Sequence, residues 1–394
     1  MQFFLPDMRE EADLRIERLR RLMRESHVDA LLASTTANIF YLSGRVYRGY
    51  VYVPLEGEPL WLVVRPDAFD AGSRVVALRK PEMIPDVLGR FGMRMPECVA
   101  LECQEAAYSD IVRLQKVFAG CRFADASALL DKAREIKTPF EIAAMKRDGL
   151  HHVAVYERID RCFKRDMTDL EFQIEIERVL RREGCIGYPR VRGDNMEINL
   201  GSVVYGPNAD VPGPYDFTMG GAGFDPSLPV GADGSIMHPG HTVMVDMNGG
   251  FNGYQTDMTR TWRIGDVPDI AYKAHDCSIA ILRELEKTGV PGKRIGELYE
   301  RAVAMAREAG LEKYFMGHRS QVRFIGHGVG IQLNELPVIM GRNESELKEN
   351  MTLAIEPKFV IPEVGPVGIE NTYVVRPDGL ENITVFREEL SSLE

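Results

Sequence analysis

Hydrophobic residues follow a helical spacing in several segments of the chain, with polar residues at the positions between them. These segments cover residues 9–26, 140–163, 168–184, 269–288 and 294–309. Thr168 and Glu171 have the spacing of a capping box, in which each side chain bonds the backbone N–H of the other residue. The last four helices form two pairs, and each pair precedes strand-like runs. The pattern therefore predicts an α/β (α+β) chain in which two helices and a sheet occur twice.

Strand-like runs near the N-terminus are short and alternate with helical stretches. We expect strands in VDALLAS, NIFYLSG, YVYVPLE and PLWLVVRP, and helices in PEMIPDVLGRF and YSDIVRLQKVF. In the segment 134–146, Pro139 stands at the start of a new helix. A chain of 394 residues can bury two hydrophobic cores, so two domains are expected.

Two aspartates lie at the edges of apolar runs that form the two arms of a predicted β-hairpin. Asp246 ends one run, Asp257 precedes the other, and residues 248–253 between them are rich in Asn and Gly. If the turn is centred near Phe251 and Asn252, the two aspartates lie directly opposite one another, with Cβ atoms roughly 5 Å apart. Two carboxylates at that distance repel each other unless a cation lies between them.

A second pair of acidic residues and one histidine extend this pattern. Glu356 and Glu370 flank a turn at residues 362–366, again with apolar residues on both arms, and His327 lies between glycines. Taken singly, each carboxylate would be interpreted as a turn cap or a surface ion-pair partner. Taken together, four carboxylates and one imidazole carry a formal charge of about minus four, which two divalent cations would neutralise. We therefore predict a dinuclear metal site.

Four motifs hold these five residues in order along the chain: DMNGGFNGYQTDMTRTW, GHGVG, AIEP and GIEN. In this order they resemble the motifs of the pita-bread metallohydrolases, the family of prolidase, aminopeptidase P, methionine aminopeptidase and the metal-free creatinase. The resemblance covers nearly the whole chain. It implies a creatinase/prolidase-like N-terminal domain at 1–135 and a pita-bread metallopeptidase catalytic domain at 136–394.

The resemblance also implies a role for each ligand. Asp246 would bind one metal ion, His327 and Glu356 would bind the other, and Asp257 and Glu370 would bridge the two. Glu356 would in addition carry a proton from the bridging water to the leaving amine. Carboxylate-rich ligation favours manganese, with iron, cobalt and zinc as alternatives. The family's N-terminal domain often helps to form a dimer, so a homodimer is expected.

The chain departs from the family's peptidases where they contact the substrate. Asn334 stands where a histidine is usual, and no histidine follows Gly206-Pro207-Asn208 before Phe217. Gly368 replaces an arginine that is common in prolidase and aminopeptidase P, and Asn371 replaces a common aspartate. Asn334 is a candidate hydrogen-bond donor to a substrate carbonyl or oxyanion, but it cannot transfer protons as imidazole does.

Other residues are candidates for the missing substrate contacts. His318 is a candidate catalytic substitute for the absent histidines. The Gly- and Pro-rich segment 215–240 is expected to overhang the metal site or, alternatively, to be an exposed elaboration without a role. Arg190 and Arg192 share one face of an extended segment, where they would bind a substrate carboxylate or pair with local acids. Arg260 is expected to be structural.

Composition and charge exclude several classes of partner. The net charge of −11 and a pI near 5.4 argue against nucleic acid or an anionic membrane surface. The six cysteines show no paired spacing and are expected to be reduced thiols. The first residues lack the basic start and apolar core of a signal peptide, and no apolar run is long enough to span a membrane. A cytoplasmic location is therefore expected.

Three hypotheses for the function follow from these observations. The first is a metallo-exopeptidase of the Xaa-Pro dipeptidase or aminopeptidase type, which hydrolyses a small peptide with metal-activated water. The second is a non-peptidase with the same metal site, such as a creatinase-like hydrolase or a lyase acting on a small zwitterion. The third is a binding protein without catalysis, against which the complete ligand set argues. We take the first as the working prediction, since the ligand set is intact.

Overall fold

The computed structural model describes residues 8–66, 74–193 and 196–394. The first residues, on which the expectation about a signal peptide rests, lie outside this range. By its internal contacts the chain divides into two compact units, Met1–Arg134 and Glu135–Glu394. No helix within the described ranges is both long and apolar enough to cross a bilayer. All six cysteines are unpaired thiols.

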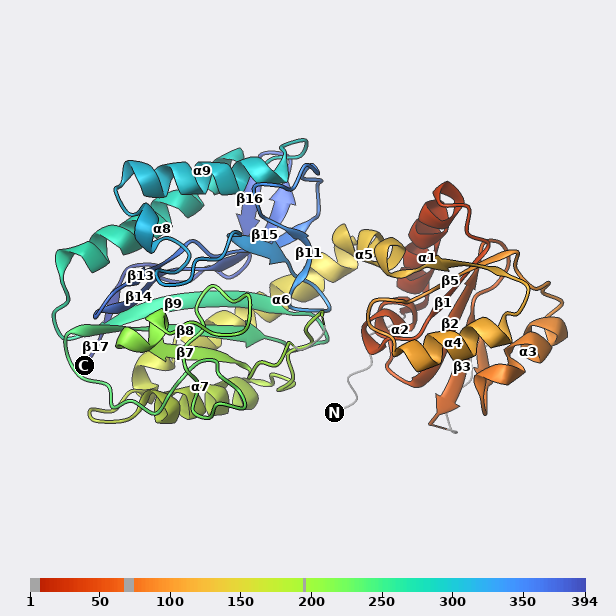
Figure 1. The fold of residues 1–394 in the computed structure, drawn as a ribbon, viewed down its shortest axis with the longest axis horizontal. Helices are drawn as coiled ribbons and strands as arrows, with labels where there is room; N and C mark the ends of the chain where they lie inside the picture. Colours follow the sequence, from red (N-terminus) through yellow and green to blue (C-terminus); the bar gives the residue numbers. More distant parts are fainter. Residues whose placement is uncertain (1–7, 67–73, 194–195) are drawn as a thin grey trace. The chain divides into compact units, whose positions relative to one another are not determined.

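Unit 1 contains a mixed sheet flanked by helices (Figure 1). The sheet has the strand order β4-β3-β2-β1-β5-β6 within the described residues, and β1 pairs antiparallel with β2 but parallel with β5. Its strands are β1 (Ala30–Ala33), β2 (Arg48–Pro54), β3 (Leu60–Arg65), β4 (Val75–Ala77), β5 (Cys98–Leu101) and β6 (Arg122–Asp125). Its helices are α1 (Met8–Glu25), α2 (Thr36–Ser43), η1 (Pro81–Met83), α3 (Ile84–Arg90), α4 (Tyr108–Val117) and α5 (Ser127–Glu135).

One predicted strand of unit 1 is wrong, because the run NIFYLSG forms helix α2. Thr35 caps this helix by accepting a hydrogen bond from the backbone N–H of Asn38, and Gly44 ends it in the left-handed conformation at φ 73°. The carboxylate of Glu102 adds a negative charge at the N-terminus of the helix, where it accepts from the backbone N–H of Thr35 at 2.8 Å. These two caps outweigh the strand propensity of the aromatic and β-branched residues between them.

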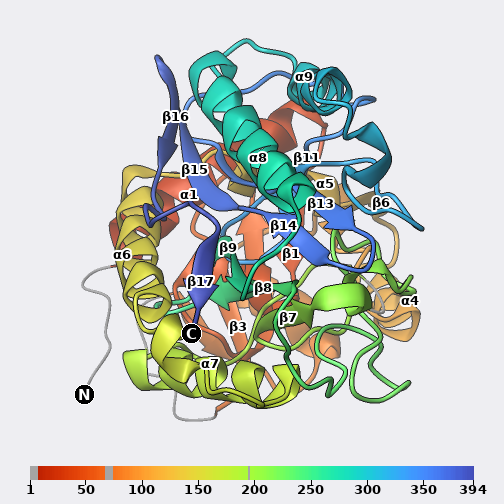
Figure 2. The ribbon, with the colours of Figure 1, turned by 90° about the vertical axis from the view of Figure 1, so that its left-hand side faces the viewer.

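Unit 2 places its strands between two pairs of helices (Figure 1). On one side α6 (Pro139–Tyr156) and α7 (Asp169–Glu183) pack around buried Phe172 and Trp262. The sheet beneath them has the order β17 (Ser391–Leu393), β9 (Thr256–Ile264), β8 (His241–Gly249) and β7 (Gly201–Tyr205). On the other side α8 (Asp269–Thr288) and α9 (Ile295–Glu308) pack around buried Leu282 and Phe359. Figure 2 shows α8 crossing β13 (Lys358–Ile361) and β14 (Gly365–Gly368). The order of two helices and a sheet, repeated once, agrees with the hydrophobic pattern.

The helices of unit 2 begin close to their predicted positions. They are α6 (Pro139–Tyr156), η2 (Ile159–Cys162), α7 (Asp169–Glu183), η3 (Gly206–Asp210), α8 (Asp269–Thr288), α9 (Ile295–Glu308) and η4 (Glu312–Tyr314). The helix predicted at 140–163 ends at Tyr156 and is followed by a 3₁₀ turn. The capping box of Thr168 and Glu171 is present, as predicted.

The strands of unit 2 form three sheets among the described residues. A five-stranded sheet has the order β11-β10-β12-β15-β16, and β13 pairs with β14 alone. The strands are β7 (Gly201–Tyr205), β8 (His241–Gly249), β9 (Thr256–Ile264), β10 (Gly326–Gly328), β11 (Glu335–Val338), β12 (Thr352–Ile355), β13 (Lys358–Ile361), β14 (Gly365–Gly368), β15 (Asn371–Arg376), β16 (Gly379–Asn382) and β17 (Ser391–Leu393).

The hairpin that carries the two aspartates forms, but its register differs from the prediction. Asp246 pairs with Thr259 and Asp257 pairs with Asn248, so the aspartates are offset by two residues rather than directly opposite. The reason is the turn, whose centre lies one residue further along the chain than Phe251 and Asn252. Since side chains alternate with a period of two, the offset keeps both carboxylates on one face. As diagonal neighbours they lie roughly 7–8 Å apart at Cα, which leaves space for a cation between them.

In the second acidic hairpin the two glutamates lie opposite one another, and Gly365 and Pro366 of the predicted turn belong to β14. Ile355 pairs with Asn371 on one side of the acidic pair, and Lys358 pairs with Gly368 on the other. Both pairs belong to the same antiparallel register, which places Glu356 opposite Glu370 at the break between the two sheets.

Candidate metal centre

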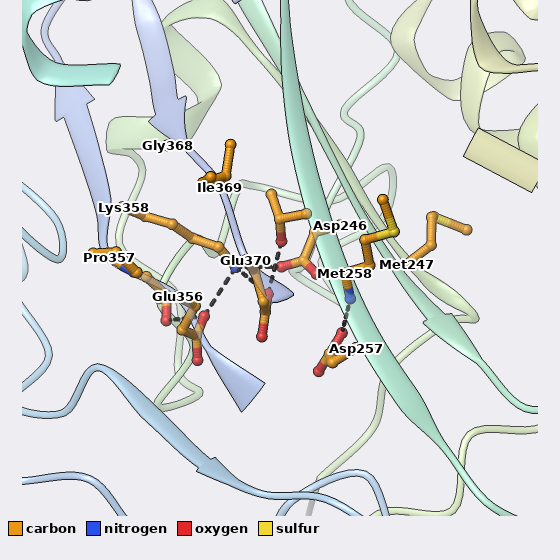
Figure 3. A network of polar contacts seen from close by, with 12 residues as sticks. Asp246, Met247, Asp257, Met258, Glu356, Pro357, Lys358, Gly368, Ile369 and Glu370 are labelled. Carbon is orange, nitrogen blue, oxygen red and sulfur yellow. Dashed lines mark hydrogen bonds and ion pairs between the residues drawn. The ribbon is translucent and has the colours of Figure 1, made fainter. Parts of the chain in front are cut away.

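All five predicted ligands line one cavity within unit 2. Figure 3 shows the four carboxylates among them close together. Asp246 lies on β8, Asp257 on β9 and His327 on β10. Glu356 lies between β12 and β13, and Glu370 lies between β14 and β15. An antiparallel bridge between Thr259 of β9 and Glu370 joins the two hairpins. The side chains of Asp257, Glu356 and Glu370 are buried, and those of Asp246 and His327 are partly buried.

One half of the cluster fits a divalent metal ion. Ligand atoms of Asp257, His327 and Glu370 lie within 4.8 Å of one another. Nε2 of His327 is 3.8 Å from Oδ2 of Asp257 and 3.9 Å from Oε1 of Glu356. An ion about 2.0–2.2 Å from each of these atoms would hold them at such separations.

Two further observations point to a cation at this position. Nδ1 of His327 lies 3.0 Å from the carbonyl oxygen of Gly328, and donation to that carbonyl leaves the lone pair on Nε2 free for a metal. Oε1 of Glu370 is buried and has no hydrogen-bond partner among the described residues. A buried carboxylate oxygen without a partner is unfavourable, and a bound cation would satisfy it.

The other half of the cluster already holds a cation, the ammonium group of Lys358 (Figure 3). Its Nζ donates to Oδ2 of Asp246 at 2.8 Å, to Oε2 of Glu356 at 2.9 Å and to Oε2 of Glu370 at 3.0 Å. The same three carboxylates form the second group that could hold a metal ion. The side chain of Lys358 is fully buried. Our sequence interpretation missed this residue, although a lysine inside the apolar run LAIEPKFVI was a signal.

The charges of the cluster remain unbalanced with one ammonium. Burial, followed by the charge of Glu370, raises the pKa of Asp257 well above its ordinary value. Burial also raises the pKa of Glu370 to about 8, although the charge of Lys358 opposes this. Burial alone would lower the pKa of Lys358, but the carboxylates of Asp246, Glu356 and Glu370 outweigh it and hold that pKa well above its ordinary value. A divalent ion beside Asp257 would relieve the excess negative charge.

Arg260 of β9 fixes the backbone around the ligands. Its Nη1 donates to the carbonyl oxygens of Thr259 and Glu370, each at 2.8 Å, and its Nη2 donates to Oδ1 of Asn371 at 2.8 Å. The Arg260 side chain is buried. The expectation that Arg260 is structural is therefore confirmed, and Asn371 is one of its acceptors.

The ligands line a cavity of about 340 Å³. The segment 215–240 supplies part of its wall, including Phe217 and Thr218. Oγ1 of Thr218 donates to Oε2 of Glu356 at 2.6 Å. The expectation that this segment overhangs the site is confirmed, and it also holds one of the ligands in place.

The two other candidate catalytic residues lie in different surroundings. Asn334 lines the metal cavity, but its Oδ1 accepts from the backbone N–H of Arg192 at 2.6 Å and its Nδ2 donates to the Arg192 carbonyl at 2.9 Å. Nδ1 of His318 lies 2.9 Å from Oδ2 of Asp210, in a neighbouring cavity of about 670 Å³. His318 is not among the residues that line the metal cavity. The structure thus brings Asn334, but not His318, to the ligands.

Fold and site together define a metal-dependent hydrolase with a carboxylate-rich centre. The model of metallopeptidase family M24 matches residues 143–377, and that of the creatinase/prolidase N-terminal domain matches residues 15–136. The chain belongs to metallopeptidase family M24. The predicted family, fold class and metallo-exopeptidase type of enzyme are thereby confirmed, and the family implies divalent metal ions as cofactors.

Relatives and solved structures match over nearly the whole chain. The Xaa-Pro dipeptidase of Pyrococcus furiosus is 24% identical over 383 residues, which are 95% of this chain and 99% of the relative. The structure of the Xaa-Pro dipeptidase from Bacillus anthracis superposes with a TM-score of 0.81 at 22% identity, covering 97% of this chain and all of that one. The prolidase from Pyrococcus horikoshii gives a TM-score of 0.78 at 20% identity, covering 96% and 99%.

Proposed function

We propose that this protein is a metal-dependent exopeptidase that hydrolyses a small peptide of the Xaa-Pro type. The observation that carries the proposal is the set of Asp257, His327, Glu370 and Glu356, which line one cavity and include a group that could hold a metal ion. The choice of substrate is supported by a relative that matches over nearly its whole length and is named an Xaa-Pro dipeptidase. A creatinase-like or lyase reaction on a small zwitterion is the alternative, and the argument for it is the absence of the histidines that usually contact the peptide substrate.

The residues present can perform the steps of such a hydrolysis. A divalent ion, when bound by Asp257, His327 and Glu370, would polarise the scissile carbonyl and lower the pKa of water. Oε2 of Glu356 is held by Thr218 and Lys358, whereas its Oε1 faces His327 at 3.9 Å. We assign to Oε1 the proton that leaves the attacking water and that Glu356 then delivers to the leaving amine.

Asn334 and Arg192 form part of the proposed substrate wall. The two hydrogen bonds between the Asn334 amide and the Arg192 backbone fix a segment that lines the cavity. Asn334 still has a second N–H on its amide, because an NH₂ group has two donors. We propose that Asn334 positions this wall and donates its remaining N–H to the substrate.

The metal, the assembly and the cell compartment complete the proposal. We propose manganese, with iron, cobalt or zinc as alternatives, because the ligands are mainly carboxylates. We also propose a homodimer built from two-domain chains, with domains at 1–135 and 136–394, in the cytoplasm. The six unpaired cysteines support a reducing compartment. Gel filtration with light scattering tests the dimer.

The experiment that tests the activity is the turnover of a small panel by protein loaded with manganese. The panel contains Xaa-Pro dipeptides, Xaa-Pro tripeptides, dipeptides without proline, and creatine. Glu356→Gln is the control, because the amide keeps the shape of the side chain but cannot take up the proton.

The expected result is cleavage of Xaa-Pro peptides by the native protein and none by the control. Cleavage of dipeptides without proline would keep the exopeptidase and change its specificity. Turnover of creatine alone would move the protein to the non-peptidase alternative. No turnover of any peptide by protein with confirmed metal would refute the proposal.

A further inference from the structure

We infer that the ammonium group of Lys358 permanently takes the place of one of the two metal ions, so that this chain binds a single divalent ion beside Asp257, His327 and Glu370. The inference rests on the metal centre of the proposed function, but it concerns the number of ions and not the substrate. It changes the prediction of a dinuclear site that the five ligands alone suggest.

The distances decide which cation can occupy the second position. Nζ of Lys358 lies 2.8–3.0 Å from one oxygen each of Asp246, Glu356 and Glu370, which is the length of charge-assisted hydrogen bonds. A metal ion in that group would have to approach the same carboxylates to roughly 2.0–2.2 Å. An ammonium nitrogen and a metal ion cannot both occupy the space between three carboxylates.

The ammonium group is fully satisfied where it is. A lysine has three N–H donors, and each of the three finds a carboxylate oxygen. Displacing the ammonium group by a metal ion would break these three hydrogen bonds. Because the side chain of Lys358 is 0% exposed, its charge would then be buried without a partner. With no N–H to spare, Lys358 does not donate to the substrate and acts as a fixed cation.

The backbone around Lys358 is shaped to hold it. Lys358 pairs with Gly368 across the hairpin, and a Cβ on Gly368 would lie 2.9 Å from the Cα of Lys358. Gly368 also has φ +133°, which side chains rarely allow. On the other side, the carbonyl of Lys358 accepts from the backbone N–H of Met316 at 2.8 Å. Gly368, one of the departures from the family noted in the sequence, thus leaves room for the strand that carries the lysine.

The first metal position remains available beside this fixed cation. Lys358 and Thr259 both donate to Oε2 of Glu370, whereas Oε1 of Glu370 is buried with no hydrogen-bond partner in the part of the chain that the structure describes. Glu370 and His327 form, with Asp257, the group whose ligand atoms lie within 4.8 Å of one another. Four carboxylates, one ammonium and one divalent ion leave a charge of about minus one, whereas a second ion would make the charge positive.

The experiment counts metal ions in the native chain and in three variants. Each protein is loaded with excess Mn²⁺, desalted and analysed for manganese per chain by mass spectrometry. Electron paramagnetic resonance of the same samples separates an isolated manganese ion from a magnetically coupled pair. Unfolding curves establish that each variant is folded.

The variants separate the lysine from other buried charges. Lys358→Ala opens the second position and removes its cation, so we expect two ions per chain. Asp246→Asn removes a carboxylate that contacts the ammonium of Lys358 and is not part of the group of Asp257, His327 and Glu370. We therefore expect this variant to keep one ion. Lys137→Ala is the matched control, because Lys137 is also buried and paired, with Glu335 at 3.0 Å. We expect it to keep one ion.

The native chain gives the first decision. One isolated ion supports the inference, and a coupled pair overturns it. No bound ion overturns it together with the metal centre of the proposed function. One ion without any peptide turnover would leave this inference standing and refute only the proposed activity.

The variants give the second decision. A single ion in folded Lys358→Ala would overturn the inference, since the lysine would then not be what excludes the second ion. If Lys358→Ala does not fold, Asp246→Asn decides: one ion supports the inference, and loss of the ion overturns it.

Discussion

Arg260 joins three parts of unit 2, and its replacement by lysine is the sharpest test of how the centre is held. Its Nε donates to the carbonyl of Arg387 at 2.7 Å, and its two Nη atoms serve the carbonyls of Thr259 and Glu370 and the amide oxygen of Asn371 at 2.8 Å. Two longer bonds run from Nη2 to the carbonyls of Phe386 at 3.3 Å and Thr384 at 3.5 Å. A guanidinium reaches the four nearer acceptors because its donors point in fixed, different directions. An ammonium group donates from one point and cannot.

The magnitude follows from the hydrogen bonds that Arg260→Lys removes. If the lysine keeps two of the four, two hydrogen bonds from a charged donor are lost, at about 1–3 kcal/mol each, while the carbonyls of Thr259 and Glu370 keep the backbone N–H of the other residue as a donor. We therefore expect unit 2 to lose about 2–6 kcal/mol of unfolding free energy. Because the carbonyl of Glu370 is one of the acceptors, we also expect the Kd for Mn²⁺ to rise about 10-fold or more.

Urea unfolding followed by tryptophan fluorescence measures the loss of stability. Trp262 lies in the same strand and is buried, so it reports on this region, and Trp61→Phe removes the signal of unit 1. Arg263→Lys is the matched control, since Arg263 is also on β9 but partly exposed, with 27% of its side chain accessible. A loss below about 1 kcal/mol in Arg260→Lys, or one equal to that of Arg263→Lys, would refute the reasoning.

Four further predictions test other parts of the chain. Burial raises the pKa of Asp148 from 3.8 to about 8. Between these pH values the folded chain keeps a proton that the unfolded chain releases, so the free energy of unfolding falls as the pH rises from about 4 to 8. Asp148→Asn should flatten this fall in urea unfolding compared at the two ends of that range; an unchanged slope would contradict it. Thr168→Ala removes the capping box of α7 and should cost about 1 kcal/mol in the same assay, whereas no change would show that the cap contributes nothing. Thr218→Val removes the hydroxyl that holds Glu356 and should lower kcat with little change in KM; a change in KM alone would place Thr218 in substrate binding. Chelation of the metal should lower the melting temperature of unit 2, by the equivalent of about 2.7 kcal/mol relative to protein with free metal at 100 times Kd, and an unchanged melting temperature would contradict a bound ion.

The helices could be predicted because their signals are local. The capping box of Thr168 and Glu171 and the start of α6 at Pro139 depend on residues within a few positions of one another. Local signals also misled at NIFYLSG, where the strand propensity of the run was clear and the capping role of Glu102 was not. Glu102 lies far from α2 in the sequence and reaches it only through the sheet of unit 1.

The hairpin of Asp246 and Asp257 shows a prediction that was partly right. The alternation of apolar and polar residues fixed the face on which both side chains lie, because that depends only on odd or even spacing. The register depends on where the turn closes, and several Asn and Gly residues in succession allowed more than one position. The carboxylates are therefore diagonal neighbours and not an opposed pair.

The sequence by itself determined the family and the type of fold and predicted the five candidate ligands, since these are carried by residue identities and by short motifs in a set order. Only the tertiary structure showed that the ammonium of Lys358 lies among three of the four carboxylates. Lys358 lies two residues from Glu356 but 112 from Asp246, and no spacing along the chain indicates that its ammonium meets both. The physical reason is that a buried ammonium group is stable only where all three of its N–H donors have acceptors. Here the acceptors are carboxylates that folding brings together, Asp246 from β8 and Glu356 and Glu370 from the connections between strands.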